Sequence, residues 1–344
     1  MDPGWGPRSL VGFSWGVVIG GVAQLVCQFP ALRAVGYRFV ADFRWNDPGV
    51  RQILRLMGPA VIAASVTQVN VVVNSMFAYG VGEGAVSWLS YAFRLMQLPI
   101  GVFGVAVATV TLPALSRAAM GGVGEDFGPT LAKGLKLVMF LVFPATVGLV
   151  VLAGPIISLI YERGAFDAGD REATAGALRA YGYGLLFYAG LKVLQPAFYA
   201  IEKRWLPLVA SFMALAVNIG CNYVFVFVYK WGHESLALTT SIVASLNFVF
   251  LYAAMARYAG DIGTKGVVIA FLKIGVATAV MAVMCQAADR TIFAELGEML
   301  LWKKAAYLGG VIAVSGGAYF VVAKLLRVEE VSEMLGLVRR KAKD

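Results

Sequence analysis

The sequence predicts an all-α polytopic membrane protein, and three observations support this prediction. Of the 344 residues, 60% are hydrophobic and only 14% are charged, whereas soluble domains carry about 25% charged residues. Several apolar runs reach the roughly 20 residues that an α-helix needs to cross a bilayer. The 39 glycines and 12 prolines are spread through these runs, which is typical of a helical bundle that changes shape, such as a transporter.

Nine membrane-spanning helices are predicted along the chain. The first apolar run follows "MDPGWGPRSL" directly, and it is interpreted as a mature helix because no cleavable signal peptide is evident. The third run is long enough to tilt or bend, and Pro99 and Pro113 supply places for a bend. The approximate ranges are 10–30, 58–80, 85–115, 135–160, 175–200, 206–229, 235–257, 266–287 and 305–326.

The distribution of Lys and Arg predicts the orientation of these helices. Most of the 29 Lys and Arg residues fall on the side that carries the C-terminal tail, and positive residues mark the cytoplasmic side. The C-terminus is therefore expected in the cytoplasm and the N-terminus of this chain outside. The most polar connection, 32–57, alternates Arg with apolar residues, which favours either an amphipathic helix on the membrane surface or a solvated linker.

Enzymatic chemistry and bound metals are disfavoured. The predicted spans contain no carboxylate pair, and the only histidine, His233, lies in a short connection. The chain has no HExxH motif and no phosphate-binding glycine loop. Cys27, Cys221 and Cys285 lie in or beside apolar runs and form no motif. We expect a transporter rather than an enzyme, with no catalytic residue, no metal site and no nucleic-acid partner.

One permanent positive charge, Arg94, lies inside the third predicted span. At 1.5 Å per residue it is roughly 13 Å from the start of that helix, which is close to mid-bilayer. A guanidinium at that depth is satisfied by backbone carbonyls, by a carboxylate on another helix or by a bound anion, and no acid is near it in sequence. Its planar fork suits a phosphate or a carboxylate. The polar residues at helical spacing on the same face are Ser87, Ser90, Tyr91 and Gln97.

Three further features are candidates for a binding role. Lys192 lies midway along the fifth span and either faces a ligand or extends toward the interface. The connection 161–178 resembles a solvated loop that leads into a helix, with Asp170 as its N-cap. A group of uncharged polar residues favours hydrogen bonds between helices, with Na⁺ coordination as the alternative: Gln68, Asn70, Asn74, Asn218, Asn222, Thr239 and Thr240.

Several segments together resemble the MurJ (MviN) family of lipid II flippases. The most specific is "VSWLSYAFRLMQLPIGVFGVAVATVTLPALSR" (86–117), which follows "MGPAVIAASVTQVNVVVNSMFA" (57–78). The others are "WGVVIGGVAQLVCQFPALRAVGYRF" (15–39), "YERGAFDAGD" (161–170) and "YGYGLLFYAGLKVLQPAFYA" (181–200). The resemblance runs from about residue 10 into the seventh predicted span and weakens over the last two.

The resemblance implies a fold and a domain organisation. The family belongs to the multidrug/oligosaccharidyl-lipid/polysaccharide exporter superfamily and has fourteen spans, of which the nine here match helices six to fourteen. Residues 1–31 would be the last helix of the N-terminal lobe and 32–57 a cytoplasmic amphipathic linker. Residues 58–258 would form the C-terminal six-helix lobe, and 259–344 two extra helices with a cytoplasmic tail. The rest of the N-terminal lobe would be a partner, from the same gene or from a second chain.

The resemblance also implies an activity. Family members move the undecaprenyl-pyrophosphate-linked peptidoglycan precursor, lipid II, from the inner to the outer leaflet of the bacterial inner membrane by alternating access. Arg94 matches the arginine of the "R-L-M-x-x-P" context, which is thought to meet the pyrophosphate. Lys192 and the polar stripe would line the route. The alternatives are another exporter of the superfamily, for a drug or a glycolipid, and a non-transporting scaffold for cell-wall synthesis.

Two departures from the family pattern bear on the site and on the driving force. Gln97 stands where some members carry an acid, which removes one partner for Arg94. Some relatives hold Na⁺ with carboxylates on the helices that match Asn74, Asn218 and Asn222, which are all amides here. These three residues and Thr239 are the candidate cation site. Since the site lacks negative charge, membrane potential is the preferred driving force, with Na⁺ and H⁺ as alternatives.

Overall fold

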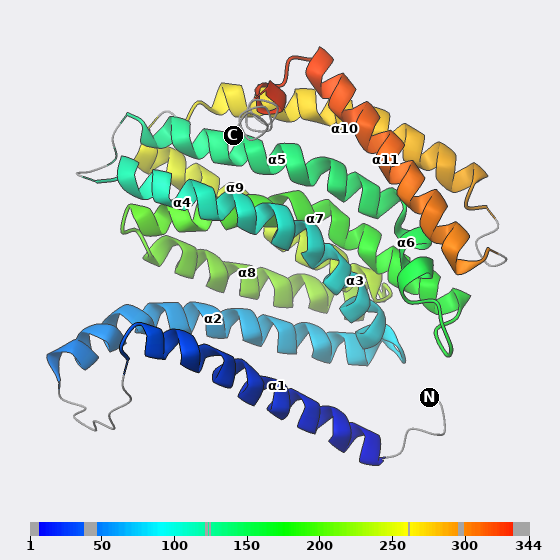
Figure 1. The fold of residues 1–344 in the computed structure, drawn as a ribbon, viewed down its shortest axis with the longest axis horizontal. Coiled ribbons are helices and arrows are strands. Elements are labelled where there is room, and N and C mark those ends of the chain that lie inside the picture. Colours follow the sequence, from blue (N-terminus) through cyan, green and yellow to red (C-terminus); the bar gives the residue numbers. More distant parts are fainter. Residues whose placement is uncertain are drawn as a thin grey trace. The chain divides into compact units, whose positions relative to one another are not determined.

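A computed structural model of the protein describes residues 7–37, 47–120, 123, 125–260, 262–294 and 299–332 (Figure 1). Every regular element in these ranges is a helix, which confirms the all-α prediction. In chain order the elements are α1 (Pro7–Ala34), α2 (Pro48–Val81), α3 (Ala85–Pro99), η1 (Ile100–Val105), α4 (Ala106–Ala118), α5 (Phe127–Val151), α6 (Ala153–Ile160), α7 (Ala168–Ala200), α8 (Trp205–Tyr223), η2 (Val224–Val228), α9 (Glu234–Ala259), α10 (Thr264–Thr291) and α11 (Leu301–Leu325).

Seven stretches within the described residues are long and apolar enough to cross a membrane. They are Ser14–Ala34, Ala85–Ala118, Phe127–Val151, Trp205–Val228, Glu234–Ala259, Thr264–Thr291 and Leu301–Leu325. The remaining two expected spans correspond to α2 and α7, helices of 34 and 33 residues that are not among the seven. In α7, charged side chains such as Arg179 and Lys192 lower the mean hydropathy. The count of nine therefore stays a prediction.

The chain divides into two compact units, one made of residues 1–58 with 163–165 and the other of residues 59–162 with 166–344. The first unit contains α1 and the first turns of α2. The predicted linker 32–57 is partly helical, because α1 extends to Ala34 and α2 begins at Pro48. Residues 48–57 continue directly into the second predicted span instead of forming a separate surface helix. The middle of the linker, 38–46, lies outside the described residues.

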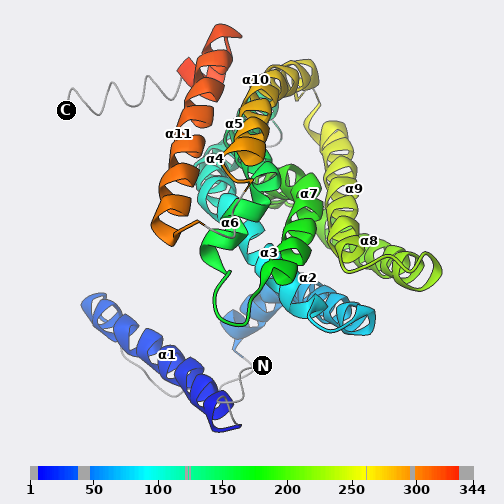
Figure 2. The same cartoon turned by 90° about the vertical axis from the view of Figure 1, so that its right-hand side faces the viewer.

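The larger unit is organised around α7, which packs against α3, α5, α6 and α9 (Figure 2). Its approach to α9 depends on glycine, because a Cβ atom on Gly184 would lie 2.5 Å from the Cα atom of Ser241. Ser241 also donates a hydrogen bond from Oγ to the carbonyl oxygen of Ala180, at 2.7 Å. Small residues and a buried hydroxyl at such a contact are typical of helices that associate within a membrane.

The third predicted span is one continuous rod that changes helix type. Helix α3 ends at Pro99, η1 is a π-helix over Ile100–Val105, and α4 continues to Ala118. Proline lacks a backbone N–H and crowds the carbonyl four residues before it, and π segments inside α-helices are frequent at functional sites. The irregularity follows the first of the two predicted prolines, whereas the chain remains α-helical through Pro113.

The last two helices, α10 and α11, pack against each other, and α10 packs along α5 (Figures 1 and 2). They share a second hydrophobic cluster that includes Phe140, Ile274, Ala277 and Tyr319. The buried Tyr319 hydroxyl donates a hydrogen bond of 2.7 Å to the carbonyl oxygen of Phe140. This contact satisfies a phenol that would otherwise be desolvated at a cost.

Candidate functional site

Arg94 lies on α3, less than two turns before the change to π-helix, and its side chain is exposed on the larger unit. Within the described part of the chain it forms no ion pair with a carboxylate. An exposed guanidinium without a protein counter-charge keeps all five of its N–H donors available for a bound anion.

The other residues of the predicted stripe differ in their surroundings. Ser87, Ser90 and Gln97 are exposed with Arg94, and Ser90 donates its hydroxyl proton to the carbonyl oxygen of Val86 on its own helix. Tyr91 is only partly exposed because it packs into an aromatic group. The stripe therefore presents polar atoms along one face of α3 as predicted, with the aromatic group beside it.

The aromatic group consists of Tyr91, Tyr161 and Phe166. The ring of Tyr91 lies 4.7 Å from that of Tyr161 and 5.8 Å from that of Phe166, measured between centroids. Burial raises the pKa of the Tyr161 phenol, while the positive charge of Arg94 opposes that rise. Tyr161 is therefore neutral at physiological pH and can act as a hydrogen-bond donor close to the guanidinium.

Lys192 lies on α7 and is exposed. In the described residues neither a hydrogen bond nor an ion pair joins it to Arg94 or to a carboxylate. The rod that carries Arg94 does approach the same stretch of α7, because a Cβ atom on Gly104 of η1 would lie 3.7 Å from Ala189. Lys192 is thus one turn beyond a contact with η1.

Three of the four candidate cation ligands meet in a chain of amides. Asn222 donates from Nδ2 to the Oδ1 atoms of Asn74 and Asn218, at 2.8 and 3.0 Å. Asn74 in turn donates to Asn70 at 3.0 Å. Helices α2 and α8 are therefore joined by side-chain hydrogen bonds, the interhelical role that the sequence favours for these residues.

The amide chain leaves one acceptor unused. The Oδ1 atom of Asn222 is buried and has no hydrogen-bond partner in the described part of the chain. Thr239, the fourth candidate ligand, lies on α9 and is fully buried, and its hydroxyl likewise finds no partner there. Both residues are uncharged, so they would offer a cation only neutral oxygens.

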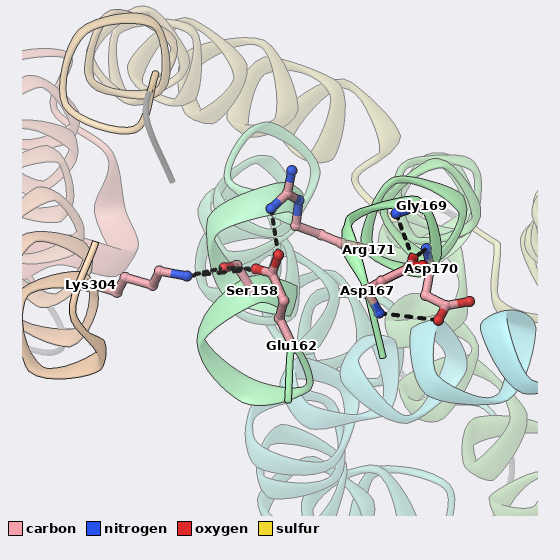
Figure 3. A network of polar contacts seen from close by, with 7 residues as sticks. All are labelled: Ser158, Glu162, Asp167, Gly169, Asp170, Arg171 and Lys304. Atoms are coloured by element: carbon pink, nitrogen blue, oxygen red, sulfur yellow. Dashed lines mark hydrogen bonds and ion pairs between the residues drawn. The ribbon is translucent and has the colours of Figure 1, made fainter. Parts of the chain in front are cut away.

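A polar cluster that the sequence did not reveal joins α6, α7 and α11 (Figure 3). The carboxylate of Glu162 accepts hydrogen bonds from the buried Ser158 hydroxyl and from Arg171, the latter at 2.8 Å. Lys304 of α11 donates to the Oγ atom of Ser158 at 2.8 Å, and its Nζ atom lies 3.6 Å from Glu162. We call Ser158, Glu162, Arg171 and Lys304 the polar clamp.

The electrostatics of the polar clamp favour ionised Glu162. Burial alone would raise the pKa of this carboxyl group. The hydrogen bonds from Ser158 and Arg171, with the positive charges of Arg171 and Lys304, outweigh burial and lower the pKa. The side chains of Lys304 and Glu162 are only 10% and 17% exposed, so water screens the interaction less than at an open surface.

The prediction that Asp170 is the N-cap of α7 is wrong by three residues. The N-cap is Asp167, whose carboxylate accepts hydrogen bonds from the backbone N–H groups of Gly169 and Asp170 (Figure 3). Asp170 occupies the third helical position and accepts from the backbone N–H of Asp167 at 3.2 Å. The two aspartates thus form a reciprocal capping box.

Asp170 also links α7 to α3 through a hydrogen bond with Trp88. Its carboxylate accepts a hydrogen bond from Nε1 of Trp88 at 2.7 Å, and Trp88 packs on His233 with ring centroids 4.9 Å apart. The Nε2 atom of His233 is 2.8 Å from the carbonyl oxygen of Ala173. These contacts connect the first turns of α3 and α7 with the residue before α9. They stiffen the end of α3 that lies two turns before Arg94.

The fold and the site together define a class of protein. In the described part of the chain, membrane-length helices form an all-helical bundle, and Arg94 has no carboxylate partner there. These features define an all-α polytopic membrane protein.

The chain belongs to the lipid II flippase MurJ family, since the model of that family matches residues 1–302. It is 35% identical to the "probable lipid II flippase MurJ" of Vibrio cholerae over 324 residues, which are 92% of this chain and 60% of the relative. It is also 35% identical to the lipid II flippase MurJ of Burkholderia cenocepacia over 250 residues, or 71% of this chain and 48% of the relative. The chain thus spans about three fifths of the first of these relatives and about half of the second.

Solved structures agree with this assignment. A lipid II flippase MurJ in an inward closed conformation is 25% identical and superimposes with a TM-score of 0.66, covering 85% of this chain and 57% of that protein. An outward-facing multidrug resistance transporter of the MATE family and MOP superfamily matches with a TM-score of 0.52 at 14% identity, over 82% of this chain and 66% of that one. The second likeness concerns the fold alone.

Proposed function

We propose that this chain forms the C-terminal part of a lipid II flippase and binds the pyrophosphate of its substrate through Arg94. The observation that carries the proposal is the state of that guanidinium, which is exposed on α3 and has no carboxylate partner among the described residues. A pyrophosphate supplies the missing negative charge and fits the planar fork of arginine.

The other predicted residues have supporting roles in this proposal. Gln97, Ser87 and Tyr91 share the polar face of α3 and offer neutral hydrogen-bonding groups on either side of the charge. Lys192 extends the cationic route along α7. The π segment of η1 lies directly after the binding turn, and a change in its pitch would move Arg94 during alternating access.

The membrane arrangement and the driving force belong to the same proposal. We place the chain in the bacterial inner membrane with its N-terminus outside and its C-terminus in the cytoplasm, as the distribution of Lys and Arg predicts. The five further helices of the relatives' N-terminal lobe complete the cavity. Membrane potential is the favoured energy source, since moving one charge through 100 mV is worth about 2.3 kcal/mol.

Substitution of Arg94 in the full-length protein tests the proposal. When the cell's own flippase is depleted, Arg94→Ala should fail to support growth although the protein reaches the membrane. Arg117→Ala, which removes an exposed arginine at the end of α4, is the matched control and should support growth. Normal growth with Arg94→Ala would contradict the assigned role.

A binding measurement separates the flippase from the alternatives. Loss of a charge-assisted contact worth about 1.5–3 kcal/mol should weaken lipid II binding to the purified Arg94→Ala protein roughly tenfold or more. A drug or glycolipid exporter would instead prefer another ligand in competition with lipid II. A scaffold would tolerate Arg94→Ala in cells and would depend on the 32–57 segment.

A further inference from the structure

An apolar hollow opens in the larger unit. Helices α5, α7, α9 and α10 line it, with Met139, Phe187, Phe248, Val267, Val268 and Phe271 among the lining residues. No residue of α11 takes part, so the hollow is separate from the contact between α10 and α11. No residue of α3, the helix that carries Arg94, contributes to its wall either.

The hollow is large enough for a segment of a hydrocarbon chain and unsuited to water. Its volume is about 180 Å³, and apolar cavities of about 150 Å³ stay dry and accept benzene. Its lining has few polar groups, and two of them, the hydroxyls of Tyr252 and Thr264, lie 3.0 Å apart in a hydrogen bond to each other. A water molecule inside would therefore lack the polar partners that it needs.

The wall includes side chains that are accessible from outside. Val268 lies in the lining and is 49% exposed. Phe248, another lining residue, packs closely on α7, because a Cβ atom on Gly190 would lie 2.6 Å from the Phe248 ring. The hollow therefore reaches the surface of the bundle at Val268. In a membrane, that opening faces hydrocarbon.

Positive charge lies at the end of the hollow marked by Thr264. Lys265 follows Thr264 and is exposed. Lys136 follows the lining residue Leu135, and its Nζ atom would be 3.5 Å from a Cβ atom on Gly266. Among the described residues, the carboxylate of Glu329 lies 3.4 Å from Lys136, and its side chain is 80% exposed. Basic residues beside apolar pockets at the membrane surface are suited to anionic lipid headgroups.

We propose that this hollow binds a segment of one acyl chain of an anionic phospholipid from the surrounding bilayer. The chain enters past Val268 and lies against Phe248 and Phe271. Its phosphate stays at the surface near Lys265 and Lys136. The bound lipid then fills the space between α9 and α10. Its contacts stabilise the packing of α10, and with it α11, against the rest of the larger unit. This site requires only that the chain lies in a membrane and does not depend on the proposed flippase activity.

Photocrosslinking of a lipid tests the site. The full chain is placed in bilayers that contain phosphatidylglycerol with a diazirine midway along one acyl chain, and the labelled residues are mapped by mass spectrometry. Label should concentrate on the lining residues of α9 and α10. Val268→Trp fills the hollow and should lower that label about fivefold or more, because the indole occupies the apolar volume that the chain would bury. Val276→Trp, at an exposed position of the same helix outside the lining, should not.

Two further labelling experiments identify the kind of lipid that is bound. Lys265→Gln should reduce label from phosphatidylglycerol and leave label from a matching phosphatidylethanolamine probe unchanged. Undecaprenyl phosphate added at equal concentration should compete no better than unlabelled phosphatidylglycerol. Uniform label along α10, no effect of Val268→Trp, or preferential competition by the polyprenyl lipid would each overturn the proposal.

Discussion

Lys304 of α11 donates a hydrogen bond of 2.8 Å to Ser158 of α6, a residue 146 positions earlier in the chain. The same ammonium lies 3.6 Å from Glu162, which Arg171 also binds. The last helix is therefore attached to the lobe by charge as well as by the apolar cluster around Tyr319. Partly buried ion pairs of this kind are costly to break, since the remaining charge is left without compensation.

Removing Lys304 should therefore destabilise the protein. Lys304→Met keeps the length of the side chain but removes the donor to Ser158 and one of the two positive charges beside Glu162, so we expect a loss of about 1–3 kcal/mol. Thermal unfolding of the purified protein in detergent measures the change. Lys303→Met is the matched control, because Lys303 is exposed and its Nζ atom lies only near the Trp302 ring, 5.8 Å from the centroid. Equal effects of the two substitutions would show that the clamp contributes nothing specific.

The polar clamp should also make stability depend on pH. The folded-state pKa of Glu162 is lower than its ordinary value of 4.5, so the unfolded chain takes up a proton first as the pH falls. The stability contribution is complete above about 4.5 and disappears as the pH falls through the lower folded-state value. Melting temperatures of the natural protein and of Glu162→Gln should therefore differ at pH 7 and converge in acid. A constant difference across this range would contradict the assignment.

The amide chain between α2 and α8 should show energetic coupling. Asn74→Ala and Asn222→Ala each remove the 2.8 Å hydrogen bond between these residues, so the double variant should lose less than the sum of the single ones. Interhelical hydrogen bonds in membranes average about 0.6 kcal/mol and reach about 1.7 kcal/mol, which sets the expected coupling. A double-mutant cycle in detergent measures it. Ser75→Ala, whose hydroxyl bonds only to its own helix, should show no coupling with Asn222→Ala.

The close contact between α7 and α9 predicts opposite effects of two glycine substitutions. Gly184→Ala places a methyl group 2.5 Å from a backbone atom of Ser241, which α9 must move to accept, at a cost of about 1–3 kcal/mol. Gly220 of α8 has nothing within 4 Å of the corresponding position. Gly220→Ala should instead raise stability by about 0.5–1 kcal/mol, because alanine favours the helix. Chemical or thermal unfolding of both variants, side by side, tests the pair.

Much of the candidate site could be predicted because it lies on one helix. The period of 3.6 residues places Ser87, Ser90 and Arg94 on a common face whatever surrounds α3, and their exposure confirms it. The same reasoning from sequence offered Pro99 and Pro113 alike as places for a bend, and the helix changes type after Pro99. Reasoning from sequence failed at the start of α7, because two aspartates three residues apart, Asp167 and Asp170, both have a side chain suited to an N-cap. The backbone conformation, extended at Asp167, decided between them.

The sequence by itself determined that this protein is an all-helical membrane protein, and it located the charge of Arg94 within one span. A bilayer forces each spanning segment to satisfy its own backbone hydrogen bonds, so the signal for a span is contained in one continuous stretch of residues. Only the tertiary structure decided that Lys304 meets Ser158, that Asn222 meets Asn74 across 148 positions, and that four helices leave an apolar hollow. Such contacts depend on how helices distant in sequence pack side by side, and no periodicity within one helix encodes its partner.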